Sequence, residues 1–306
     1  MRKVADKSVL AWSALQATPR LGAKRLVQVA VALHQRQRKG GELMDADVQE
    51  LESLGLGRAL ADSAASHLSD PPEPDLPPPG SVLLTPDDPD YPVENLNPQL
   101  PVPVLLYAAG NVALLRRRGV AVSGSRAGAK QAMRLASRIA GLLAETGINV
   151  ISGHAAGIDE TAHEEALRAG GTTTAVLAEG LLRFSPRPGI KGADPDRILV
   201  ISGFRPARRW TVYQAMERNN WIAALAQAVV VIASDVRGGS WAQARLCLDA
   251  GKRLLVPDFT EAVAPGNRQL IKQGALPIDP EDPRSVLEHL SSTEVGSSDN
   301  QTSFFG

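Results

Sequence analysis

The 306-residue sequence is poor in cysteine, in aromatic residues and in long apolar runs. Cys247 is its only cysteine, which excludes an intramolecular disulfide and a cysteine metal site, and the helical pattern around it predicts a small buried side chain. No stretch approaches the roughly 20 apolar residues of a membrane span, and the short apolar run after Lys7 lacks a signal-peptide cleavage site. We therefore expect a cytoplasmic protein without a membrane partner.

The motifs of several enzyme classes are also missing. No G-x-G-x-x-G follows a predicted strand and no G-x-x-x-x-G-K-[ST] occurs, so neither a dinucleotide cofactor nor a P-loop nucleotidase is supported. His163 follows Asp159 by one helical turn but has no second histidine at ligand spacing, which favours a packed or hydrogen-bonded histidine. Asp159 stands at an expected helix start, where a carboxylate ordinarily caps the helix. We expect no catalytic residue, metal or cofactor.

Net charge is zero, with 33 basic and 33 acidic residues, but the charges are segregated. Residues 116–138 contain seven Lys or Arg and no acidic residue, and residues 183–218 contain eight basic against three acidic residues. In the first region a basic residue recurs every four positions, as a stripe on a helix: Arg126, Lys130, Arg134 and Arg138. A solvated helix face is the ordinary interpretation. Cations at a helix N-terminus oppose the macrodipole, however, and nothing nearby in sequence pairs them, so we favour a polyanionic partner.

Predicted elements divide the chain into four parts. Residues 1–70 show helical periodicity, residues 71–80 are a proline-rich linker, residues 81–285 alternate strands with helices, and residues 286–306 form a tail expected to be disordered. One strand is predicted after the proline-rich run into residues 105–107. Further predicted strands are short, apolar and rich in β-branched residues, at 120–122, 148–151, 173–177, 198–201, 229–232 and 254–256. This pattern predicts an α/β fold with a doubly wound, mostly parallel sheet.

Two glycine elbows interrupt the N-terminal helices, at residues 21–24 and 54–58. Backbone N–H groups at such an elbow can bind a phosphate, as in helix-hairpin-helix modules. Plain helix–helix turns are commoner, and from the sequence alone we favour that interpretation.

Three predicted strands end in a Ser-Gly step, at Ser123, Ser152 and Ser202. Ligands of doubly wound sheets bind outside the carboxyl ends of the strands, where glycine admits a close approach and serine offers a donor. A Ser-Gly step is also a common turn between strand and helix. Because it recurs at equivalent positions, we predict a rim of donors along this edge.

A series of short motifs spans residues 83–278, and their order and spacing form a set: LYAAGN from Leu106, AVSGSR from Ala121, SGHAAGIDETAH from Ser152, ERN from Glu217, GS at Gly239 and GN at Gly266. As a set, these motifs resemble the Smf/DprA DNA-processing family. The resemblance implies an extended Rossmann-like domain that dimerises and binds single-stranded DNA at the strand ends. It also implies a small SAM-like helical domain at the N-terminus and transfer of the DNA to a RecA-type recombinase, chiefly during natural transformation.

The resemblance also implies site residues. Arg126 would be a principal phosphate contact, with Ser123, Gly124 and Ser125 beside it, and Lys130 and Arg134 continue the basic stripe. The remaining implied or neighbouring positions shape adjacent turns, match the family's Arg-Asn-Arg motif, or add charge near it: Gly153, Gly157, Asp159, Arg205, Arg208, Arg209, Arg218, Asn219, Gly239 and Ser240. Trp210, Tyr213 and Trp221 are aromatic residues near this cluster that can stack on bases, although core packing is the better interpretation for Trp221.

The sequence departs from the family at several positions. Asn220 replaces the second arginine of Arg-Asn-Arg, His154 replaces an apolar residue, Gly203 replaces a glutamate, Ala233-Ser234 replaces a Glu-Ala pair, and no winged-helix pattern follows residue 290. Two alternatives therefore stay open: a divergent paralogue that acts in defence against foreign DNA, and a nucleotide-binding protein or nucleotide N-glycosidase of the lysine-decarboxylase-like type. The second class uses glutamates after a Gly-rich loop, and residues 237–243 contain none.

Overall fold

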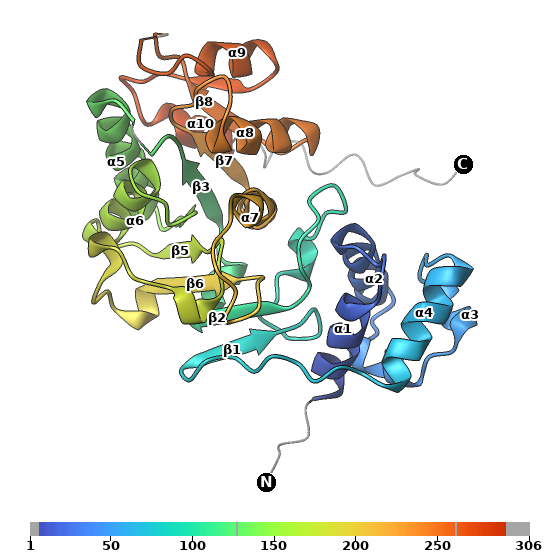
Figure 1. Cartoon of the computed structure of the whole chain (residues 1–306). Coiled ribbons are helices and arrows are strands. Elements are labelled where there is room, and N and C mark those ends of the chain that lie inside the picture. The colour runs from blue at the N-terminus through green and yellow to red at the C-terminus, as the bar shows by residue number, and fades with distance from the viewer. Residues whose placement is uncertain (1–5, 127, 261, 292–306) are drawn as a thin grey trace.

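The computed structural model describes residues 6–126, 128–260 and 262–291. A group of helices in the first 70 residues lies beside an α/β domain with one central sheet (Figure 1). No helix in these ranges has the length and apolar character needed to cross a bilayer.

The sheet has nine strands in the order β1-β2-β6-β5-β4-β3-β7-β8-β9. The pairings of β1 with β2 and of β2 with β6 are antiparallel, and the remaining pairings are parallel. The doubly wound, mostly parallel sheet predicted from the sequence is therefore confirmed. The strands are β1 Ser81–Leu84, β2 Leu106–Gly110, β3 Gly119–Ser123, β4 Asn149–Ser152, β5 Thr173–Val176, β6 Ile198–Ser202, β7 Ala228–Val231, β8 Leu254–Pro257 and β9 Leu276–Ile278.

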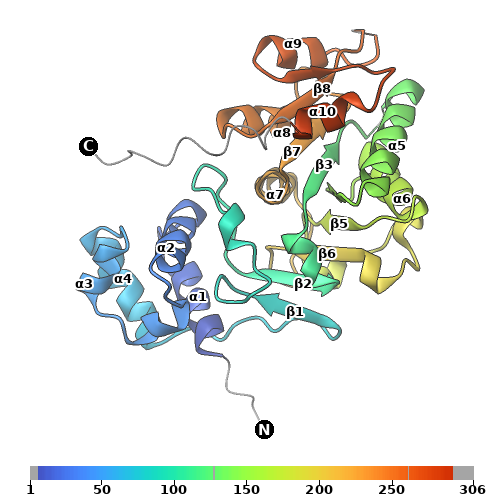
Figure 2. The same ribbon diagram turned by 180° about the vertical axis from the view of Figure 1, so that it is seen from behind.

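Helices cover both faces of the sheet and bury two separate apolar clusters (Figures 1 and 2). One face carries α5 (Lys130–Glu145), α6 (Ile158–Arg168) and α10 (Ser285–Ser291). The other carries α7 (Val212–Leu225), α8 (Gly239–Asp249) and α9 (Asn267–Lys272). Burial on both faces explains why the parallel strands are almost continuously apolar rather than alternating.

The strand order contains a switch point between β3 and β7. From β3 the chain adds β4, β5 and β6 on one side, then returns to place β7, β8 and β9 on the other. The turns that leave β3 and β7 consequently diverge to opposite faces and leave a crevice at the carboxyl ends of these two strands. Open α/β sheets bind ligands at such a crevice.

The N-terminal helices are α1 (Lys7–Ala17), α2 (Ala23–Gln35), α3 (Val48–Ser53) and α4 (Arg58–Ser69). They share an apolar cluster with Val104 and Leu105 of the sheet domain, whereas Val27 of α2 packs into the cluster under α7. The proline-rich segment that follows has no helix or strand up to β1, and Tyr107 donates its hydroxyl to the Asp75 carbonyl at 3.1 Å. The helices and the segment are thus docked on the sheet domain.

The prediction of a disordered tail from residue 286 is wrong for residues 286–291. Residues 285–291 form α10, because Val286 and Leu290 are buried against the cluster that contains α5 and α6. Residues 292–306 lie outside the described part of the chain. Strands β1 and β9 were also not predicted, since both are short and one contains Pro277.

Candidate functional site

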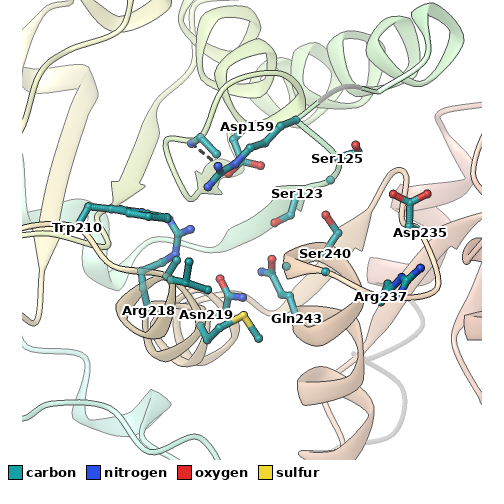
Figure 3. A pocket seen from close by; sticks show the side chains of 18 residues that line it. Ser123, Ser125, Asp159, Trp210, Arg218, Asn219, Asp235, Arg237, Ser240 and Gln243 are labelled. Atoms are coloured by element: carbon teal, nitrogen blue, oxygen red, sulfur yellow. Dashed lines mark hydrogen bonds between the residues drawn. The ribbon is translucent and has the colours of Figure 1, made fainter.

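A hollow of about 400 Å³ opens at the switch point, outside the carboxyl ends of β3 and β7 (Figure 3). Its walls come from the turn after β3, from the first half of α7 with the loop before it, and from the loop that leads into α8. Many of the predicted site residues line it: Ser123, Gly124, Ser125, Arg126, Asp159, Arg218, Asn219, Gly239 and Ser240.

The turn after β3 brings an exposed arginine to the rim. Ser125 donates its backbone N–H to the Ala233 carbonyl at 3.0 Å, which ties this turn to the segment after β7. The Arg126 guanidinium carbon lies 5.7 Å from the centre of the Trp210 ring, and no carboxylate forms an ion pair with it in the described ranges. Arg126 is therefore held by an aromatic face and keeps its N–H donors available.

Two glycines leave room for Arg126 and for Arg218, a second arginine that lines the hollow. Gly157, the first residue before α6, has φ +84, and a side-chain carbon there would collide with the backbone of Arg126. At Gly153 a side-chain carbon would collide with the Arg218 guanidinium. Gly157 thus needs glycine for its backbone conformation and for its close approach to the Arg126 backbone, whereas a larger residue at position 153 would have to displace the Arg218 guanidinium.

Arg218, which matches the family's Arg-Asn-Arg motif, lines the hollow with a buried side chain. Its Nη1 donates to the Gly153 carbonyl and, at 2.6 Å, to the Val176 carbonyl. Burial lowers its pKa, and the charge of Asp159 opposes that change. Burial raises the pKa of Asp159, while Arg218 and the amide of Ala155 counteract the rise. The hydrogen bonds of its Nη1 therefore join the ends of β4 and β5, and the Arg218 side chain also lines the hollow.

The opposite wall is the beginning of α8. Gly238 precedes this 11-residue helix and provides no side-chain cap, so its first N–H groups stay open to the hollow. Gln243 is 4% exposed, lines the hollow, and has an Nε2 without a hydrogen-bond partner among the described residues. The same is true of Ser123 Oγ, which is 3% exposed. Buried donors of this kind favour an acceptor ligand, because leaving them unpaired is costly.

Sequence reasoning missed Gln243, Arg237 and Asp235 as lining residues. The sequence feature that could have located them is the stretch Arg237-Gly238-Gly239-Ser240 before a helical pattern, because it indicates a helix N-terminus beside the hollow. Figure 3 shows Asp235 and Arg237 on one side of the hollow and Trp210 on the other, with Asn219 and Gln243 below Ser123.

Other predicted residues lie outside this hollow. Gly153 lines an adjoining hollow of about 380 Å³ that shares Arg126, Trp210 and Arg218 with the first. Lys130 and Arg134 are exposed along α5, and Arg209 is exposed in the loop before α7. Arg205 and Arg208 line a different groove, between α7 and the start of α2. The structure thus brings together the turns but not the whole basic stripe.

The predicted rim of three serine donors is wrong for two of them. Ser152 donates its hydroxyl to the Val122 carbonyl at 2.6 Å, and Ser202 donates to the Glu179 carbonyl at 2.7 Å. Both hydroxyls are used to join neighbouring strand ends. Only Ser123 of the three turns to the hollow, because it ends the strand at the switch point.

The two side chains first considered for chemistry are both buried, and Asp159 also lines the hollow. His163 is fully buried, its Nδ1 lies 2.6 Å from Thr173 Oγ1, and burial lowers its pKa to about 3. Asp159 is not the helix cap that was expected; it lies one residue inside α6, where the amide of Ala155 donates to it at 3.3 Å. The predicted burial of Cys247 is confirmed, and burial raises its thiol pKa to about 12. Among the described residues no cluster of three or more His, Cys, Asp or Glu could hold a metal ion.

Two proteins resemble this chain in sequence over part of its length. The chain is 34% identical over 177 residues to the DNA processing protein DprA of Streptococcus pneumoniae, a match that covers 56% of this chain and 62% of that protein. It is 31% identical over 212 residues to the protein Smf of Escherichia coli, covering 68% of this chain and 56% of that protein. The chain thus matches about half to three fifths of the length of these relatives.

Solved structures agree with the fold. The X-ray structure of DprA from Streptococcus pneumoniae superposes with a TM-score of 0.69 at 23% identity and covers 94% of this chain and 98% of that one. A second structure, of DprA from Helicobacter pylori, concerns the single-stranded DNA binding mode of that protein. It superposes with a TM-score of 0.57 at 25% identity and covers 62% of this chain and 88% of that one. The sequence model of the DNA recombination-mediator protein A family matches residues 82–291, and the chain therefore belongs to this family, known as DprA or Smf.

Proposed function

We propose that the chain binds single-stranded DNA at the switch-point hollow and acts as a non-catalytic DNA-processing protein. The observation that carries this proposal is the hollow itself, where exposed Arg126, two unpaired buried donors and the uncapped N-terminus of α8 converge. This combination suits a phosphate, since positive charge, N–H groups and a helix N-terminus all favour an anion. Single-stranded DNA binding by the Helicobacter pylori relative supports the choice of ligand.

The structure also supports a division of roles within the site. A phosphate at the mouth of the hollow would accept hydrogen bonds from Arg126 and from the first turn of α8. Trp210, which is 45% exposed and stacks with Arg126, offers an aromatic face to a neighbouring base. Base stacking needs unpaired bases, so this arrangement favours single strands over duplexes.

A salt series on the purified protein tests the proposal directly. Labelled single-stranded and double-stranded oligonucleotides of equal length are titrated between 50 and 200 mM salt. If about four phosphates are neutralised, log K falls with a slope near −2.8, or roughly fifty-fold over this range. Preference for single strands with such a slope is the expected result. Absence of binding at 50 mM salt would contradict the proposal.

We further propose that a homodimer of this cytoplasmic protein protects the strand and loads a RecA-type recombinase on it. Family membership supports this role. Light scattering measures the dimer, and the rate of RecA filament assembly on single-stranded DNA, with and without this protein, measures loading. We also propose that residues 1–70 and 81–285 are separate domains joined by residues 71–80, which limited proteolysis in that segment would test.

A free nucleotide is the second candidate ligand, because a hollow of about 400 Å³ falls in the size range of small-molecule sites. Nucleoside monophosphates would then displace the oligonucleotide at micromolar concentration. Release of free base from them would show an N-glycosidase and overturn the non-catalytic assignment.

A further inference from the structure

The glycine elbow at residues 21–24 faces a groove that the DNA-binding role has not used. This groove has a volume of about 400 Å³ and lies between the N-terminal helices and the sheet domain. Gly22 and Ala23 form part of one wall, and Arg205, Arg208, Tyr213 and Gln214 form part of the other. The groove thus joins the elbow to the second basic region of the sequence.

The elbow presents an open helix N-terminus to this groove. Gly22 precedes the 13-residue helix α2 and supplies no side-chain cap. The first N–H groups of α2 therefore lack side-chain acceptors, and the positive end of the helix dipole points toward the groove. The second elbow is built in the same way at Gly57 before α4, but Gly57 does not line this groove.

An independent observation indicates that the groove takes an acceptor ligand. Gln214 is 2% exposed and lines the groove; its Oε1 accepts from Thr211 Oγ1 at 2.7 Å, while its Nε2 has no partner among the described residues. Arg205 and Arg208 are exposed at the rim. Two acidic groups offset them: Asp75 pairs with Arg205 at 2.7 Å, and Glu217 lines the groove. A phosphate oxygen would satisfy the Gln214 amide and would add an anion between two arginines and a helix N-terminus.

Helix α7 separates this groove from the switch-point hollow. Val212, Ala215 and Met216 face the hollow, whereas Tyr213 and Gln214 face the groove. The crest between them is apolar and open, with Val212 67% and Tyr213 76% exposed. In both views the N-terminal helices lie on the same side of the sheet domain as α7 (Figures 1 and 2). A strand that leaves the hollow meets a surface suited to bases, followed by a second site suited to a phosphate.

We propose that a longer single strand crosses α7 and places a second phosphate at the N-terminus of α2, between Arg205 and Arg208. This inference rests on the proposed function and extends it, since it makes the N-terminal helical segment part of the DNA-binding surface. Tyr213 stacks on a base between the two phosphate sites, and Gln214 donates to the second phosphate.

The two elbows provide a matched pair of variants. Gly22→Asp places a carboxylate where the phosphate would bind, and Gly57→Asp adds the same charge at the equivalent position of α4. Both glycines have extended backbone and open space around a side-chain carbon, and aspartate is a preferred residue before a helix, so both variants are expected to fold. Binding of oligonucleotides of about 4 and about 16 nucleotides, the range of single-strand site sizes, is then compared.

Gly22→Asp is expected to weaken binding of the longer oligonucleotide about fivefold and to lower its salt slope by about 0.7, one phosphate contact. Binding of the shorter oligonucleotide should change less than about twofold, because it needs only the hollow. Gly57→Asp should leave both unchanged, and Arg208→Ala should reproduce the length-dependent loss. Equal behaviour of Gly22→Asp and Gly57→Asp, with intact binding by the unmodified protein, would overturn this inference alone. Absence of any binding by the unmodified protein would overturn the proposed function as well.

Discussion

The two ends of strand β3 both carry arginines, but their surroundings differ. At the amino end, Arg116, Arg117 and Arg118 line a hollow of about 590 Å³ into which α7 ends at Leu225. Cations are favoured at a helix C-terminus, and two of these arginines also have protein acceptors: Arg116 donates to the Pro89 carbonyl at 3.0 Å and Arg118 to Gln227 Oε1 at 3.3 Å. Arg116 and Arg118 thus have a role within the protein.

The carboxyl end of β3 has fewer exposed arginines but the opposite helix ends. Helices α6 and α8 begin there after Gly157 and Gly238, so the exposed Arg126 stands beside positive ends of helix dipoles. An anionic ligand at the proposed site would reconcile these like charges. If the strand binds there, local charge alone does not locate the binding site, because the larger of the two hollows, with three arginines, lies at the amino end.

The largest expected effect is a loss of stability at the carboxyl end of β3. Arg218→Ala leaves the carbonyls of Gly153 and Val176 without their donor and removes a nearby positive charge that lowers the pKa of Asp159. A buried acceptor left without its donor costs about 1–3 kcal/mol, so the loss of two such hydrogen bonds should lower the free energy of unfolding by about 2–6 kcal/mol. Urea denaturation measures it. Arg117→Ala, an exposed arginine at the amino end, is the control and should cost less than about 0.5 kcal/mol. A cost below 1 kcal/mol for Arg218→Ala would show that these two hydrogen bonds do not hold the strand ends.

The second effect concerns DNA affinity. Arg126→Ala removes a charge-assisted contact worth about 2 kcal/mol and should weaken single-strand binding roughly thirty-fold, with an unchanged melting temperature. Arg117→Ala should change affinity less than about twofold at physiological salt. The five residues of β3 separate the two arginines by roughly 16 Å, about twice the Debye length. Equal losses from both variants would mean that the amino end binds DNA too.

This separation also shows what the sequence could and could not predict. The strands were predictable because each is a short β-branched run buried on both faces, as in residues 120–122. The seven basic residues from 116 to 138 were counted as one cluster, although Arg118 precedes β3 and Arg126 follows it. Strand direction therefore divides them between opposite edges of the sheet, which a count along the sequence does not show.

Side-chain partners across the sheet were beyond sequence reasoning. Whether a serine hydroxyl faces a ligand or a carbonyl depends on which strand lies next to it, as Ser123 and Ser152 show. Burial of Arg218 depends on the gap that Gly153 leaves after β4, 65 residues earlier in the chain. The α10 segment was missed because its two buried residues, Val286 and Leu290, are too few for a helical periodicity.

A third prediction tests whether the carboxyl end differs in aromatic surface as well as in charge. Trp210 faces the switch-point hollow, and none of the described residues that line the amino-end hollow is aromatic. Trp210→Ala should weaken single-strand binding about tenfold, the value of one stacked base, with little change for duplex DNA. Trp210→Phe keeps a ring and should restore most of the affinity. Similar losses for alanine and phenylalanine would indicate that Trp210 acts only by holding Arg126.

The smallest expected effect on DNA affinity comes from acidic residues. Each hollow has an exposed one, Asp235 at the carboxyl end and Glu94 at the amino end. Asp235→Asn removes a negative charge beside the proposed phosphate position and should raise single-strand affinity about twofold at low salt, since exposed charge pairs contribute roughly 0.2–1 kcal/mol. Glu94→Gln changes the net charge equally and should leave affinity unchanged. The gain from Asp235→Asn should vanish near 1 M salt, where the Debye length falls to about 3 Å. A gain of the same size from Glu94→Gln would mean that net charge attracts the strand, and the difference between the two ends of β3 would no longer explain where it binds.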